Sequence, residues 1–153
     1  MKETDLNKHI QFYPFKGLGS VEFSFGEDEI INALGQPDEI DKDIISDSES
    51  VISLSYYDFG IDLFIENLDD TNILSIHSDD IIVDGKNLAY MEKDQMLKLL
   101  STFHEKNNWE FMHEKFIDEE TDEEIHYFDT IGLTIWYIED DISDICVQHP
   151  DDM

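Results

Sequence analysis

The chain of 153 residues carries 38 acidic and only 9 basic side chains, a formal net charge of −29, while 41% of its residues are hydrophobic. This apolar share is too high for a disordered acidic chain, so we expect one folded domain over residues 1–153. The charge excludes binding to nucleic acid and to anionic membranes, because both need clustered Lys and Arg.

The N-terminus and the cysteine content indicate the compartment. The first ten residues lack the apolar core of a signal peptide, and no apolar run is long enough to span a membrane. The single cysteine, Cys146, has no partner for an internal disulfide and fits an alternating strand as a small apolar residue. We therefore expect a cytoplasmic protein.

The chain begins with a strand-turn-strand pattern and a short helix. Apolar residues alternate on both sides of a glycine turn at residues 16–19, which predicts two strands between residues 9 and 25. Residues 26–34 predict a helix, because three carboxylates lie in its first turn, where the helix dipole favours them. Gly35 and Pro37 end this helix.

The next segment predicts an acidic connection and a meander. Residues 38–50 place carboxylates around three isoleucines, which is typical of a mobile or edge-lying connection. The alternating runs that follow predict three antiparallel strands, at residues 51–58, 61–66 and 72–78.

The second half starts with a short strand and a turn at Asp84-Gly85, a dipeptide typical of hairpins. Residues 92–106 predict an amphipathic helix, with an apolar stripe, acidic residues in the first turn and basic ones in the last. We expect strands at residues 109–112 and 125–129, with a solvated acidic loop at 118–124 between them.

One strand-turn-strand pattern occurs twice, at residues 56–78 and 128–147. Aligning its two glycines pairs apolar residues throughout: Gly60 with Gly132, Ile61 with Leu133, Leu63 with Ile135, Phe64 with Trp136, Ile65 with Tyr137, Ile73 with Ile142 and Ile76 with Ile145. Because a helix and an acidic connection precede each copy, we predict tandem repeats at about 9–80 and 81–149. The expected fold class is α+β, two repeats of a helix plus an antiparallel β-meander that form one sheet with the helices on one face.

Residues 16–39, KGLGSVEFSFGEDEIINALGQPDE, resemble small bacterial proteins of the immunity or uncharacterised type. The helix exit Leu34-Gly35-Gln36-Pro37 is also similar to that of small outer-membrane assembly lipoproteins and of the beta-lactamase-inhibitory-protein superfamily. The resemblance implies tandem helix-plus-sheet repeats whose combined sheet binds another protein. The chain shows neither the lipidated cysteine of the lipoproteins nor the disulfides of the inhibitors, so an envelope role and a β-lactamase target are not carried over.

Motifs for catalysis are absent from the sequence. The six histidines show neither HExxH nor a paired zinc spacing: His9, His77, His104, His113, His126 and His149. The Asp-rich stretches suit loose binding of a hard cation but contain no EF-hand loop. We expect no catalytic residue, no metal site and no cofactor, while paired carboxylates for glycoside chemistry stay open because their spacing is spatial.

A basic partner protein is the hypothesis that the charge favours. Phe64 and Trp136 hold matching places on the strand face opposite the core, either as interface anchors or as residues covered by a second layer. Carboxylates in the acidic loops would steer the partner: Asp118, Glu119, Glu120, Asp122, Glu123, Glu124, Glu139, Asp140 and Asp141. We expect an immunity protein that neutralises a basic toxin such as a nuclease. The alternative is a structural or adaptor module whose acidic surface keeps it in solution.

Overall fold

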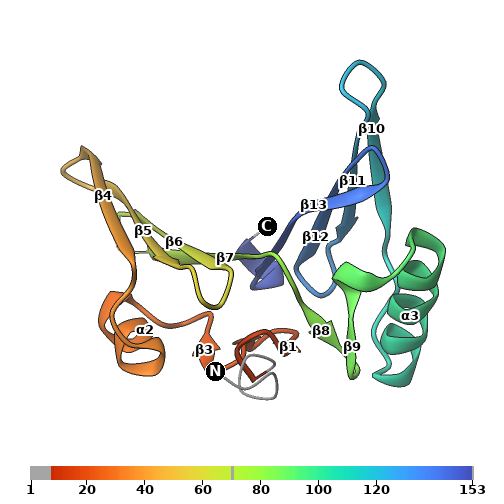
Figure 1. Ribbon diagram of the computed structural model, residues 1–153. Helices are drawn as coiled ribbons and strands as arrows, with labels where there is room; N and C mark the ends of the chain where they lie inside the picture. Colours follow the sequence, from red (N-terminus) through yellow and green to blue (C-terminus); the bar gives the residue numbers. More distant parts are fainter. Residues whose placement is uncertain (1–7, 70, 153) are drawn as a thin grey trace.

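The computed structural model describes residues 8–69 and 71–152 and has an α+β fold (Figure 1). Its largest element is an antiparallel sheet of eight strands in the order β10-β11-β12-β13-β7-β6-β5-β4. The first meander consists of β4 (Glu39–Ser46), β5 (Glu49–Tyr56), β6 (Ile61–Leu68) and β7 (Thr71–Ser78). The second meander consists of β10 (Glu114–Asp118), β11 (Glu123–Phe128), β12 (Leu133–Ile138) and β13 (Asp141–Gln148). Antiparallel pairing of β13 with β7 joins the two meanders.

The other elements lie on one side of this sheet. The helices are α2 (Glu27–Leu34), before the first meander, and α3 (Lys93–Lys106), before the second. The short elements are β1 (Phe12–Tyr13), β2 (Gly17–Leu18), β3 (Val21–Glu22), β8 (Ile82–Val83), β9 (Lys86–Asn87), η1 (Leu88–Tyr90) and η2 (Pro150–Asp152). In Figure 1 the two meanders spread apart like a V, with both helices below it. Among the described residues, no helix is long and apolar enough to cross a membrane.

Both helices lie within one residue of their predicted bounds because their ends are set locally. At α2 the Glu29 carboxylate accepts a hydrogen bond of 2.9 Å from the Gly26 amide. At α3 the Gln95 side chain accepts one of 3.3 Å from the Glu92 amide. These contacts satisfy amides that a helix start leaves without a partner inside the helix.

One hydrophobic cluster lies between the sheet and the helices. The helices contribute Ile30, Met96 and Leu100, each fully buried. Both meanders contribute alternate strand residues, among them Leu63, Ile65, Leu133, Ile135 and Tyr137. The cluster therefore spans the junction of the two meanders.

A tight turn enters the last hairpin at Gly132, which has a φ of 70°. A Cβ atom at this position would lie 2.0 Å from the carbonyl oxygen of Gln148. Only glycine fits here, because the backbone conformation and the close approach both exclude a side chain.

Two predicted segments differ from the structure. Residues 38–50, expected to be a mobile or edge-lying connection, lie at the sheet edge but form the strand β4 and the start of β5, so the meander has four strands and not three. The strand predicted at 109–112 is wrong, since no residue there belongs to a strand and β10 begins at Glu114. Aromatic packing is the reason: Trp109 lies 5.5 Å from Phe103, and Phe111 lies 6.1 Å from Phe128, between ring centroids. The segment covers the core instead of pairing.

Candidate protein-interaction face

The side of the sheet away from the helices is the candidate interaction face. Alternation along β6 buries Leu63 and directs Asp62, Phe64 and Glu66 the other way. We call this side the open face. Strand register places these described residues on it near the junction of the meanders: Val51, Asp62, Phe64, Glu66, Ile73, Ser75, His77, Ile125, Trp136, Asp144 and Cys146.

Three rings form a strip across the centre of the open face. The His77 ring lies 5.1 Å from Phe64, edge to face, and 6.1 Å from Trp136, nearly parallel to it. Phe64 and Trp136 are half-buried. The strip crosses from the first meander to the second, so the structure brings the two predicted aromatic residues onto one surface. His77, which the sequence indicated only as one of six histidines without a zinc-site spacing, links them.

His77 carries a positive charge in this strip. Its Nδ1 atom donates a hydrogen bond of 2.6 Å to the Asp144 carboxylate. This bond and a second one with Cys146 raise the pKa of His77 to about 10, against the effect of burial. The imidazole is therefore protonated at neutral pH, and Asp144 balances its charge. Cys146 itself is only 8% exposed, as expected for a small apolar strand residue.

Lysine is absent from the open face of the described strands. The two lysines of the eight-stranded sheet, Lys42 and Lys115, point toward the helices, where they form ion pairs with Glu27 and Glu124. The register places carboxylates on the open face in every strand of the sheet but β7 and β12: Glu39, Asp41, Asp43, Glu49, Asp62, Glu66, Glu114, Asp118, Glu123, Asp141 and Asp144. The open face of the sheet therefore carries carboxylates without lysine, and both lysines of the sheet lie on the helix side.

A hollow of about 650 Å³ lies beside the strip. Its lining residues come from β5, β6, β7 and β13 and the adjoining turn: Val51, Asp62, Phe64, Glu66, Ser75, His77, Asp79, Ser143 and Asp144. Burial, and then the charges of Asp80, Asp62 and Asp144, raise the pKa of the Asp79 carboxyl. The contribution of these three carboxylates reflects a negative potential beside Asp79.

The acidic loops form a separate group at the outer end of the second meander (Figure 1). Glu119, Glu120 and Asp122 are exposed in the turn between β10 and β11, and Glu139 and Asp140 are exposed in the turn between β12 and β13. The Glu139 amide donates to the Asp122 carbonyl over 3.2 Å, which holds the two turns together. Asp118 ends β10, and Asp141 begins β13 as an exposed residue.

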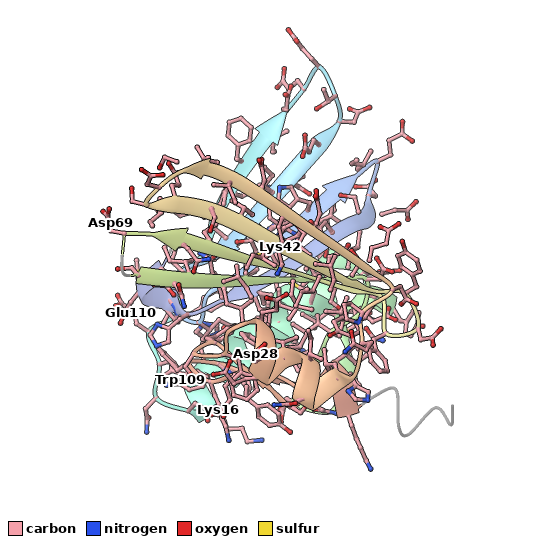
Figure 2. All side chains as sticks on the ribbon, turned by 90° about the vertical axis from the view of Figure 1, so that its left-hand side faces the viewer. Lys16, Asp28, Lys42, Asp69, Trp109 and Glu110 are labelled. Carbon is pink, nitrogen blue, oxygen red and sulfur yellow. The ribbon has the colours of Figure 1, made fainter. Side chains whose placement is uncertain are left out.

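Glu124 differs from the other predicted steering residues, because it lies on the helix side. Its carboxylate forms ion pairs with Lys93 and Lys115. Burial would raise the pKa of Glu124, but hydrogen bonds from Lys93 and His126 outweigh it and lower the pKa to about 2. Glu124 therefore helps to dock α3 on the sheet. Figure 2 shows the same helix side with Lys16, Asp28 and Trp109, while Asp69 marks the turn between β6 and β7.

A pair of histidines also lies on the helix side. His113 Nε2 and His126 Nδ1 are 2.8 Å apart, and the two rings are parallel. Burial is the main cause that lowers both pKa values, so the pair is neutral at pH 7. Within residues 8–69 and 71–152, no three His, Cys, Asp or Glu side chains are grouped so as to hold a metal ion.

Comparisons of the chain with protein-family models, with curated proteins and with solved structures found no match.

Proposed function

We propose that this protein is a cytoplasmic inhibitor that binds a basic protein through the open face. Its partner would be a toxin such as a nuclease, which makes the chain an immunity protein. The observation that carries the proposal is the division of charge in the sheet. The open face combines carboxylates with a strip of three rings, and both lysines of the eight-stranded sheet point to the other side.

Two physical effects support this function. A face with one sign of charge attracts a partner of opposite charge and raises the rate of association. Aromatic side chains ringed by polar groups supply most of the binding energy in protein interfaces. A protein that binds phosphate is itself basic, so carboxylates on the open face compete with nucleic acid for the same surface.

The second candidate is an adaptor module in which the acidic turns only maintain solubility. The position of these turns at the outer end of the second meander favours it (Figure 1). The two candidates differ in what binding does to the partner. An inhibitor abolishes the partner's activity, whereas an adaptor leaves it unchanged.

We also propose that the two meanders are copies of one unit. In each meander, a hydrogen bond from a glycine amide closes a turn. The Gly60 amide donates to the Tyr57 carbonyl, and the Gly132 amide donates to the Asp129 carbonyl. The strand register supports most of the predicted alignment, since Ile76 faces Leu63 as Ile145 faces Ile135. It differs at one place: a bulge in β13, where Ser143 is the extra residue, makes Leu74, and not Ile73, the counterpart of Ile142.

The experiment starts with capture of the partner from cell extract at 50 mM NaCl, followed by measurement of association rates with the purified pair. We expect a basic partner whose association rate falls at least tenfold between about 50 and 300 mM NaCl. The variant Phe64→Ala/Trp136→Ala is expected to weaken binding by about 100-fold, because each anchor contributes roughly 1–2 kcal/mol.

The control variant Glu105→Gln/Glu110→Gln changes two exposed residues on the helix side, away from the open face. It should bind as the wild type does. An acidic partner, or a rate that does not depend on salt, would contradict the proposal. Binding without loss of the partner's activity would favour the adaptor.

A further inference from the structure

The lining of the hollow on the open face contains the Phe64 ring, with a carboxylate on each side of it along β6. Phe64 lies between Asp62 and Glu66 on β6, and alternate residues of a strand project to the same face roughly 7 Å apart. His77 meets Phe64 edge to face, at 84° between the ring planes, so one face of the phenyl ring is not stacked on His77. Ser75, directly opposite Phe64 on β7, adds a hydroxyl to the lining.

The charge of the hollow is balanced only in part by the protein. His77 is the basic residue of its lining, and Asp144 shares that charge. In the described part of the chain no lysine forms an ion pair with Asp62, Glu66 or Asp79. The lysines that form ion pairs there do so with other carboxylates. A cationic group from another molecule would balance the remaining negative charge of the hollow.

An aromatic ring between two carboxylates selects among cations. A guanidinium is planar, stacks on aromatic faces and donates several hydrogen bonds in its plane to carboxylates. An ammonium is a compact point charge that is strongly hydrated and does not stack. A ring flanked by two carboxylates therefore fits arginine better than lysine.

We propose that the hollow receives an arginine side chain of the partner protein, with the guanidinium stacked on Phe64 and hydrogen-bonded to Asp62 and Glu66. The inference rests on the proposed function, since it names the part of a basic partner that the open face recognises. The strip that continues through His77 to Trp136 lies beside this position, where the rest of the partner's segment would pack.

The test uses two small probes, acetyl-arginine methylamide and acetyl-lysine methylamide, in NMR titrations of the full chain at low salt. We expect the arginine probe to shift the Phe64 ring and the Ser75 and His77 amides with a dissociation constant on the order of millimolar. The lysine probe should bind at least about threefold more weakly.

Two variants and one control decide the outcome. Asp62→Asn/Glu66→Gln is expected to lose the arginine-induced shifts, while Glu105→Gln/Glu110→Gln, with the same change in net charge, keeps them. Phe64→Leu retains the carboxylates without the ring, so arginine and lysine should then bind equally and weakly. Because the changed polar side chains are exposed, unchanged spectra away from the hollow will show that the fold is retained.

Equal shifts from both probes in the wild type, or shifts spread over the acidic turns, would overturn the inference. That result leaves the proposed function intact, because salt-dependent capture of a basic partner tests it separately. An arginine-selective hollow in a protein whose captured partner is acidic would contradict the proposed function and leave the arginine site itself intact.

Discussion

At the scale of single residues, His77 shows how a side chain gains a role from distant neighbours. Its hydrogen-bond partner Asp144 lies 67 positions away in the chain. Cys146, which also raises its pKa, faces it across the junction of the meanders. The protonated ring therefore strengthens the contact between β7 and β13, on which the continuity of the sheet depends.

The pKa of His77 predicts a loss of stability at alkaline pH. A folded pKa of about 10, above the ordinary value of 6.5, means that the folded state binds the proton more tightly than the unfolded state. The stabilisation is complete below pH 6.5 and is lost as the pH rises toward 10. Between pH 6 and 9 the wild type should lose about 1–2 kcal/mol more free energy of unfolding than His77→Gln, allowing for partial solvent exposure.

Urea unfolding followed by circular dichroism at pH 6, 7.5 and 9 measures this difference. The range stops at pH 9 because the tyrosine hydroxyls ionise only above it. Parallel pH profiles for the two proteins would show that the pair with Asp144 has no net effect.

At the scale of elements, one lysine holds α3 against the second meander. Lys93 forms ion pairs with Glu124 and with Asp140, the latter at 2.6 Å, and its ammonium lies 5.1 Å from the centre of the Tyr137 ring. The Glu124 side chain is only 14% exposed, so loss of its partner leaves a poorly solvated carboxylate. This cluster ties the start of α3 to β11 and to the turn between β12 and β13.

Replacing Lys93 should lower the free energy of unfolding more than replacing an exposed lysine does. Lys93→Gln is expected to lower the free energy of unfolding by about 1–3 kcal/mol, because Glu124 then keeps only weaker partners. The control Lys106→Gln removes an exposed ion pair with Asp84 and should cost less than about 0.5 kcal/mol. Denaturant unfolding of both variants at pH 7 provides the comparison, and equal losses would contradict a special role of Lys93.

At the scale of the whole molecule, the net charge of −29 acts against folding. Carboxylates crowd the open face and the acidic turns, and compaction brings these like charges closer together. Salt screens this repulsion, since the Debye length falls to about 10 Å at 0.1 M.

Stability should therefore increase with ionic strength. Between 20 and 300 mM NaCl we expect the Tm to rise by about 2–4 °C, which corresponds to roughly 1 kcal/mol for a chain of this size. Differential scanning calorimetry measures the rise, and choline chloride at equal ionic strength is the control. A rise with NaCl alone would indicate cation binding in place of screening, and a fall would contradict the effect of repulsion.

The sequence by itself determined the local elements. Both helices and the strands at 51–58, 61–66 and 72–78 lie close to their predicted places. Periodicity and capping depend on residues two to four positions apart, so they can be read without knowledge of the fold. The aromatic residues Phe64 and Trp136 were found in the same way, as outward positions of alternating strands.

Only the tertiary structure decided how these elements meet. The pairing of β7 with β13, the place of His77 between Phe64 and Trp136, and the inward position of Glu124 depend on contacts across the two meanders or with α3. Segment 109–112 alternates like a strand, but its rings gain more by packing against the core than by pairing. Local pattern decides which way a side chain points from its strand, whereas register and packing between distant segments decide which side chains it meets there.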